Sequence, residues 1–108
     1  MNNNRLIEIL NLAIDQISLD KAKTVDCIYA AGICSHISRL CHIGIITIDE
    51  RQKTREFLKE NKPDDKQFTK YITGKYWTGN TFWWKPMSQE IETAQIRINY
   101  LRELIKTI

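Results

Sequence analysis

The chain of 108 residues has no apolar run of about 20 residues, the length that a helix needs to cross a bilayer. Its first ten residues, MNNNRLIEIL, also lack the apolar core and the small-residue cleavage site of a signal peptide. These absences argue against a membrane-spanning or secreted protein. We therefore expect a soluble protein of the cytoplasm with no membrane partner.

Cysteine is scarce, and its number is odd: Cys27, Cys34 and Cys41 recur every seven residues. On a helix this spacing separates neighbouring sulfurs by about 10 Å along the axis, too far for a disulfide or a shared zinc ion. Together with the small residues Ala30 and Ala31, these cysteines instead predict a seam where a second helix packs closely.

A metal site is the alternative interpretation of the same stretch, and it requires that the stretch is not helical. Its ligands would be Cys27, Cys34, His36, Cys41 and His42. Cys41 and His42 are neighbours in sequence, so on a helix they point about 100° apart. We therefore expect no metal.

Catalytic motifs are also missing. The sequence has no glycine-rich phosphate loop, no H-E-x-x-H pattern and no nucleophile elbow, and no pair of carboxylates stands out from the solvated background. The sequence therefore predicts a non-enzymatic protein with no catalytic residue and no cofactor.

Glycine and proline are few, at four and two residues, and neither a linker nor a repeat is present. We therefore expect a single domain, residues 1–108, that is all-α or nearly so. Apolar periodicity and capping signals predict a compact bundle of four or five helices. The expected helices, in chain order, are residues 4–20, 25–43, 49–61, 63–72 and 88–108. Asn4 is the expected cap of the first helix. Its apolar stripe is formed by Leu6, Ile7, Leu10, Ala13, Ile14 and Ile17.

The second of these, residues 25–43, is the most apolar and is expected to be a buried central helix. Gly44 is placed to end it in a left-handed conformation. Thr47 and Glu50 then form a capping box for the third helix. That helix is highly charged, and we expect it to lie on the surface with three apolar anchors, Ile48, Phe57 and Leu58.

The last helix is predicted to begin at Ser88, its cap, after Pro86. Apolar residues then recur at a/d spacing over almost three heptads and are expected to face the core. These residues are Ile91, Ala94, Ile98, Leu101, Ile105 and Ile108. Ile96 and Tyr100 form a second apolar flank, which we interpret as a lid over the preceding segment or a contact between subunits.

The aromatic segment, residues 66–87, precedes this helix and holds seven of the ten aromatic residues. Residues 66–85 carry four lysines and no acid, whereas the rest of the chain is nearly neutral. A loop with a short hairpin around residues 78–81 is expected here, because Gly74 and Gly79 interrupt regular structure.

Two interpretations of the aromatic segment stay open. Its rings could close the core, since each buries about 150 to 250 Å². Alternatively, lysines could meet phosphate or acidic groups while exposed rings stack on a ligand. Trp83 and Trp84 are adjacent, so in an extended chain they point to opposite faces and cannot both enter one core. The predicted binding residues are Lys70, Lys75, Tyr76, Trp77, Trp83, Trp84 and Lys85.

The order of several motifs resembles a group of small uncharacterised accessory proteins of tailed bacteriophages. The motifs are a capping box at residues 47–50, Asn-x-Pro at 61–63, Trp-Trp-x-Pro at 83–86, Arg97 with Ile98 and Leu101, and a Leu-Ile ending at 104–105. The resemblance covers residues 32–108, and residues 78–81 are an insertion relative to it. It implies a protein that binds and blocks a host enzyme or defence component, and it supplies no catalytic residues.

Together these observations predict a stoichiometric inhibitor of a bacterial defence system, acting in the host cell cytoplasm. It would bind a host protein or a nucleotide immune signal through the aromatic segment. One alternative is a regulator that binds nucleic acid through the same lysines. Another is a structural protein without a ligand, in which the cysteine seam and the last helix form a homodimer.

Overall fold

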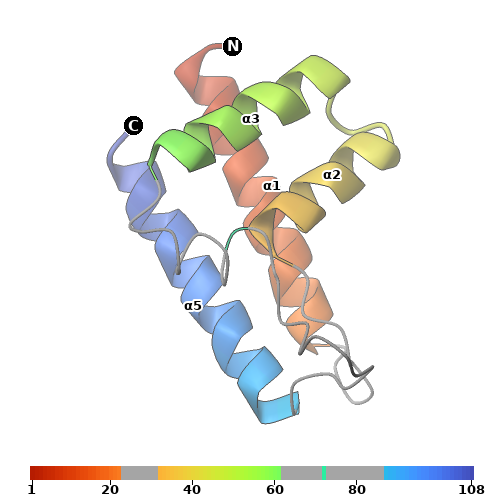
Figure 1. Cartoon of the computed structure of the whole chain (residues 1–108), viewed down its shortest axis with the longest axis vertical. Helices are drawn as coiled ribbons and strands as arrows, with labels where there is room; N and C mark the ends of the chain where they lie inside the picture. The colour runs from red at the N-terminus through yellow and green to blue at the C-terminus, as the bar shows by residue number, and fades with distance from the viewer. Residues whose placement is uncertain (23–31, 62–71, 73–86) are drawn as a thin grey trace, which may run out of the picture.

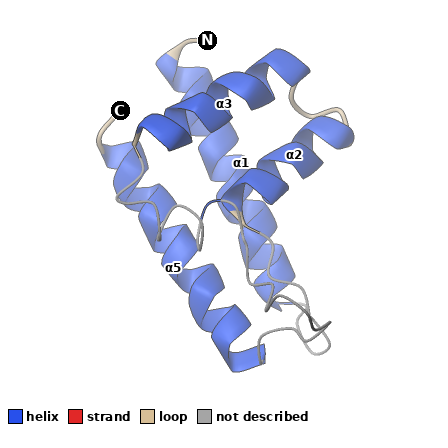
Figure 2. Cartoon of the chain, in the orientation of Figure 1, coloured by secondary structure: helices blue, strands red, loops and turns tan. Residues whose placement is uncertain are grey.

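The computed structural model describes residues 1–22, 32–61, 72 and 87–108 (Figure 1). Four α-helices are found in these ranges: α1 (Asn3–Ala22), α2 (Ile33–His42), α3 (Ile48–Glu60) and α5 (Met87–Lys106). Figure 2 shows helices and short turns but no strand in the described part of the chain. The all-α prediction is therefore confirmed. The predicted helix at 63–72 and the hairpin around 78–81 lie outside the described residues, apart from Ile72.

The helices pack in the spatial order α3, α2, α1 and α5. Helix α1 contacts α5 on one side and α2 on the other, and α2 also contacts α3. The long helices α1 and α5 run through much of the molecule, and α3 crosses near one end of them (Figure 1). The predicted central helix is described from Ile33 onward, and it shares the central place with α1.

One continuous core joins the described helices. Its fully buried members include Ile9, Leu10 and Ile17 of α1, with Ile33 and Ile37 of α2. Leu58 of α3 and Leu101 of α5 close it from the other two helices. No described helix combines the length and apolar character required to span a membrane.

The cap of helix α1 lies two residues before the predicted cap, Asn4. The backbone N–H of Arg5 donates to Oδ1 of Asn2 at 2.8 Å, so Asn2 caps the helix and Asn4 lies within it. Ile9, which the predicted stripe left out, is completely buried, whereas Ile7 is only half-buried. Helix α1 itself was predicted correctly, but the prediction placed its cap and the centre of its apolar face at the wrong residues.

The turn between α2 and α3 confirms the prediction made for Gly44. Gly44 has a φ of 85°, the left-handed conformation expected of it. The N–H of Ile45 donates to the carbonyl of Leu40 at 2.9 Å, and that of Gly44 to Cys41 at 3.0 Å, the paired bonds of a Schellman motif. These bonds satisfy backbone carbonyls that the end of α2 would otherwise leave open.

Helix α3 starts with the predicted capping box. The N–H of Glu50 donates to Oγ1 of Thr47 at 3.1 Å, and the N–H of Thr47 donates to Oε1 of Glu50 at 2.9 Å. Two of the expected anchors are confirmed, since Leu58 is completely buried and Phe57 packs against the core. The third, Ile48, is 71% exposed, and Thr54, which was not expected, is completely buried. Thr54 can be buried because its hydroxyl donates to the carbonyl of Glu50 at 2.7 Å.

Helix α5 starts at Met87, one residue before the predicted cap Ser88. Among residues 94–108, the buried apolar side chains are Ile98 and Leu101, as expected, and Leu104, whereas Ile105 is half-buried against the core. Leu101 and Leu104 are three residues apart and therefore lie on the same face of α5.

Candidate functional site

The predicted binding residues all lie outside the part of the chain that the structure describes. They are Lys70, Lys75, Tyr76, Trp77, Trp83, Trp84 and Lys85. The described residues do show how the scaffold holds the chain on either side of them. The candidate site is therefore built from these attachment points and from the described surface.

The first attachment point is Asn61, the C-cap of α3. Its side-chain amide donates to the carbonyl of Phe57 at 2.8 Å. Its own carbonyl accepts a hydrogen bond from the hydroxyl of Tyr100 on α5, at 2.9 Å. Burial raises the pKa of the Tyr100 hydroxyl, which keeps it a donor. The end of α3 is thus tied directly to α5 through the hydroxyl of Tyr100, whose side chain also packs against the core.

The other attachment points are Ile72 and Met87. Ile72 is 1% exposed and belongs to the hydrophobic core. Met87 is the first residue of α5, whose later turns pack against α1. Most of the predicted binding residues lie in the sequence between these two points, so the scaffold holds that stretch at both ends.

A network of ion pairs joins the starts of α1 and α3. Arg5 pairs through Nε with Oε2 of Glu50, and its Nη1 lies 2.6 Å from Oε1 of Glu8. A further Arg5 nitrogen donates to the carbonyl of Ile45 at 3.2 Å. The hydrogen bond from Arg5, together with that from the Thr47 backbone, lowers the pKa of Glu50 to about 2. This network, called the Arg5–Glu50 clamp below, has its charges satisfied within the protein and holds two helices together.

The predicted metal ligands do not form a cluster in the described residues. No three His, Cys, Asp or Glu side chains of these residues are grouped closely enough to hold a metal ion, and Cys27 lies outside them. Cys34 and Cys41 are free thiols that pack half-buried against the core, whereas the buried face of α2 is formed by Ile33, His36, Ile37 and Leu40. Burial raises the pKa of the Cys34 thiol, although Arg55 opposes the shift. His36 is buried in the core.

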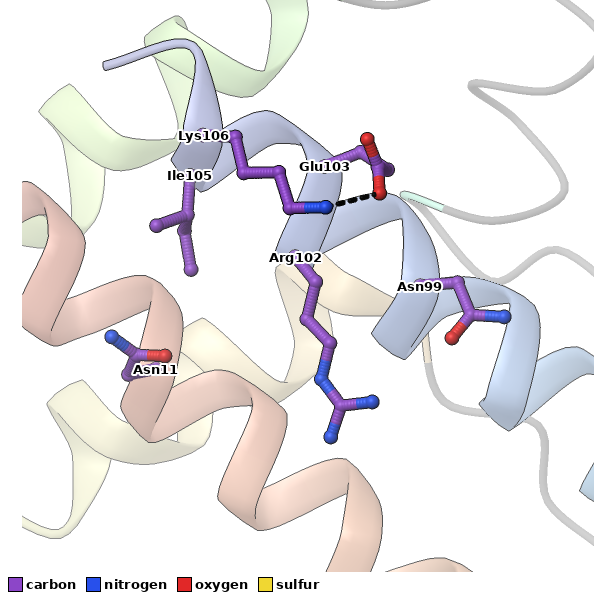
Figure 3. A pocket seen from close by; sticks show the side chains of 6 residues that line it. All are labelled: Asn11, Asn99, Arg102, Glu103, Ile105 and Lys106. Atoms are coloured by element: carbon purple, nitrogen blue, oxygen red, sulfur yellow. Dashed lines mark hydrogen bonds and ion pairs between the residues drawn. The ribbon is translucent and has the colours of Figure 1, made fainter.

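A pocket of about 340 Å³ lies between α1 and α5 (Figure 3). Asn11 lines it from α1, and five residues line it from α5: Asn99, Arg102, Glu103, Ile105 and Lys106. Lys106 Nζ is 3.0 Å from Oε1 of Glu103, the ion pair drawn in Figure 3. The Asn99 amide oxygen accepts from the side chain of Gln95 at 2.9 Å. This pocket, called the α1–α5 pocket below, combines charged and neutral polar groups with one apolar wall.

Sequence reasoning did not identify this pocket or the burial of Arg97, which is 3% exposed. A signal was present, because residues 99, 102, 103 and 106 share one face of α5 at helical spacing. A polar face of this kind usually meets only solvent, and nothing in the sequence places Asn11 opposite it.

Comparisons with known proteins add no relative to this description. No protein-family model matches the chain, and no significant match was found among the curated proteins or the solved structures. The functional inference therefore rests on the chemistry of this chain's own residues.

Proposed function

We propose that this chain is a non-enzymatic binding protein that inhibits a bacterial defence system stoichiometrically. Its contact with the target is assigned to the aromatic segment, residues 66–87. The observation that carries this proposal is the segregation of charge and rings: four lysines, no acid and seven of ten aromatic residues occupy this one stretch. A localised basic and aromatic block is the composition of a binding surface for an anionic partner.

The scaffold supports this assignment. Ile72 is held in the core, and α5 begins at Met87, so the sequence between them is attached to the helices at both ends. The hydrogen bond between Tyr100 and Asn61 fixes the chain where it leaves α3. Attachment on both sides reduces the ordering entropy that a binding segment loses when it meets its partner.

The target is a host protein or a nucleotide immune signal. Lysine ammonium groups suit phosphate or acidic side chains, and aromatic rings suit bases or the apolar centre of a protein interface. The resemblance to small phage accessory proteins gives the biological context and supports action in the host cytoplasm. Loss of a single stacked ring would weaken nucleotide binding by about 1 to 3 kcal/mol.

The decisive variant replaces Lys75, Trp84 and Lys85 together with alanine. The protein is purified gently from bacterial lysate, and native mass spectrometry records what remains bound. A retained mass of several hundred daltons that leaves on heating would identify a nucleotide, and a larger mass would identify a protein. The triple variant should lose this mass while its helical circular dichroism is unchanged.

A matched control replaces Lys53 and Lys59 with alanine. Both are exposed lysines of α3, outside the aromatic segment. This control should retain the bound mass. Retention by the triple variant as well would contradict the assignment of the segment.

Binding to nucleic acid is the alternative that the same four lysines favour. If all four contact duplex phosphates, the logarithm of the affinity should fall against the logarithm of salt concentration with a slope of roughly −3.6. An electrophoretic mobility-shift assay at low salt separates this alternative from the first. A shift with that salt dependence would move the proposal to a nucleic-acid target.

A further inference from the structure

The α1–α5 pocket contains a cation, Arg102, whose side chain is unpaired within the described part of the chain. Arg102 is exposed, and within the described residues it makes no hydrogen bond or ion pair. In Figure 3 its side chain extends from α5 beside α1, the helix that carries Asn11. Arg5, by contrast, is paired with two carboxylates. The planar guanidinium of an unpaired arginine can form two parallel hydrogen bonds to a carboxylate or phosphate.

The neighbouring charges limit which anion fits. Lys106 is already paired with Glu103 at 3.0 Å, so these two groups offset each other. Two cations and one carboxylate leave the pocket with one net positive charge. Glu103 would also repel a second negative charge brought close to Arg102. The pocket therefore suits an anion with a single charge better than a dianionic phosphate.

The remaining lining residues indicate which other chemical groups the ligand would carry. Asn99 accepts a hydrogen bond from Gln95 through its Oδ1, so its amide nitrogen is left to donate. Asn11 adds a second amide from α1, and Ile105 provides an apolar wall. The volume of about 340 Å³ falls within the range of pockets that hold small organic molecules.

We propose that the α1–α5 pocket binds a small organic carboxylate, with Arg102 as its main contact to the anion. Asn99 and Asn11 orient the ligand through hydrogen bonds, and Ile105 contacts its apolar part. The residues named for this site belong to α1 and α5, and the proposal does not depend on the function proposed above.

The test uses benzoate as the carboxylate probe, because it joins one carboxylate to a compact apolar ring. Benzoate is titrated into isotope-labelled protein, and backbone and side-chain amide signals are followed by NMR. We expect saturable shifts at residues 99–106 and at the side-chain amide of Asn11. Benzamide, which has the same shape without the charge, should bind at least about tenfold more weakly, as expected for losing a hydrogen bond to a charged group.

Two variants test the role of Arg102. Arg102→Gln should weaken benzoate binding by about tenfold or more. Arg102→Lys keeps the charge but loses the planar guanidinium with its two parallel donors, so its affinity for benzoate should lie between those of Arg102→Gln and the original protein. Arg55→Gln is the matched control, because Arg55 is an exposed arginine of α3 outside the pocket. Its affinity for benzoate should be unchanged, and thermal melts should show that all three variants are folded.

Several results would overturn the proposal. The proposed carboxylate site would be contradicted if benzoate caused no saturable shifts or if benzamide bound equally tightly. It would also be contradicted if folded Arg102→Gln kept the full affinity for benzoate. Dibasic phosphate binding as tightly as benzoate would contradict the assignment to a singly charged anion. The alanine triple variant of Lys75, Trp84 and Lys85 should keep its benzoate affinity, so failure of one proposal is distinguishable from failure of the other.

Discussion

The Arg5–Glu50 clamp and the α1–α5 pocket use the same kinds of side chain in opposite ways. In the clamp, Arg5 pairs with Glu8 and Glu50 and also reaches the carbonyl of Ile45. In the pocket, Arg102 has no such partner among the described residues, and only Lys106 and Glu103 are paired. The difference indicates that charge at the clamp joins helices, whereas charge at the pocket is left for a ligand.

The largest effect should come from the residue beside Arg102. Leu101 is completely buried, so Leu101→Ala removes apolar contacts and leaves a cavity in the core. We expect the free energy of unfolding to fall by about 2 to 5 kcal/mol. Urea denaturation followed by circular dichroism measures it. A loss below about 1 kcal/mol would mean that the core does not hold α5 in place.

A smaller effect is expected where the clamp meets the capping box. Thr47→Ala removes the oxygen that accepts the N–H of Glu50 at 3.1 Å. Loss of such a cap should lower the free energy of unfolding by about 1 kcal/mol. Thr47→Ser keeps the hydroxyl and is the matched control. Equal destabilisation by both variants would show that the methyl group of Thr47, and not its cap, is responsible.

Acid should weaken the clamp specifically. The pKa of Glu50 in the folded protein is about 2, below its usual value of 4.5, so the unfolded chain binds the proton more tightly. The stabilisation from this carboxylate is therefore complete above the usual pKa and is lost as the pH falls toward about 2. Because the clamp is partly exposed, solvent reduces the effect well below that of a buried pair.

This pH dependence is measured by comparing the original protein with Glu50→Gln in urea denaturation at neutral and acidic pH. The variant should be less stable at neutral pH, and the difference should shrink in acid. Glu103→Gln is the control, because its carboxylate belongs to an exposed pair in the pocket. A constant difference between Glu50→Gln and the original protein across this pH range would contradict the role of the clamp.

The smallest effect is expected at Arg102 itself. Arg102→Ala removes an exposed side chain without a partner in the described residues, so the free energy of unfolding should change by no more than about 0.5 kcal/mol. The same urea measurement used for Leu101→Ala gives the comparison. A loss of more than about 1 kcal/mol would mean that Arg102, like Arg5, stabilises the fold.

Much of the helical architecture could be predicted from sequence because its signals are local. The capping box of Thr47 and Glu50 and the left-handed Gly44 each depend on residues only a few positions apart. Apolar periodicity likewise predicted α1 and the buried Ile98 and Leu101 of α5. One error occurred at the start of α1, where the nearby asparagines Asn2 and Asn4 are equivalent caps in sequence.

The candidate sites show the opposite situation. The sequence locates the aromatic segment by composition alone, since residues 66–85 carry four lysines and no acid. It does not indicate that Tyr100 donates to Asn61, or that Asn11 of α1 lies across from Arg102 of α5. These partners are separated by many positions, and no local pattern encodes their distance.

The sequence by itself therefore determined the helical class, the capping of α3, the turn at Gly44 and the segregation of positive charge. Tertiary structure decided which charges are paired and which remain open to a ligand. The physical reason is that helix formation follows from contacts three or four residues apart, whereas the pairing of Arg5 with Glu50 bridges 45 positions. Only the packing of α1 against its neighbours brings such groups within a few ångströms of one another.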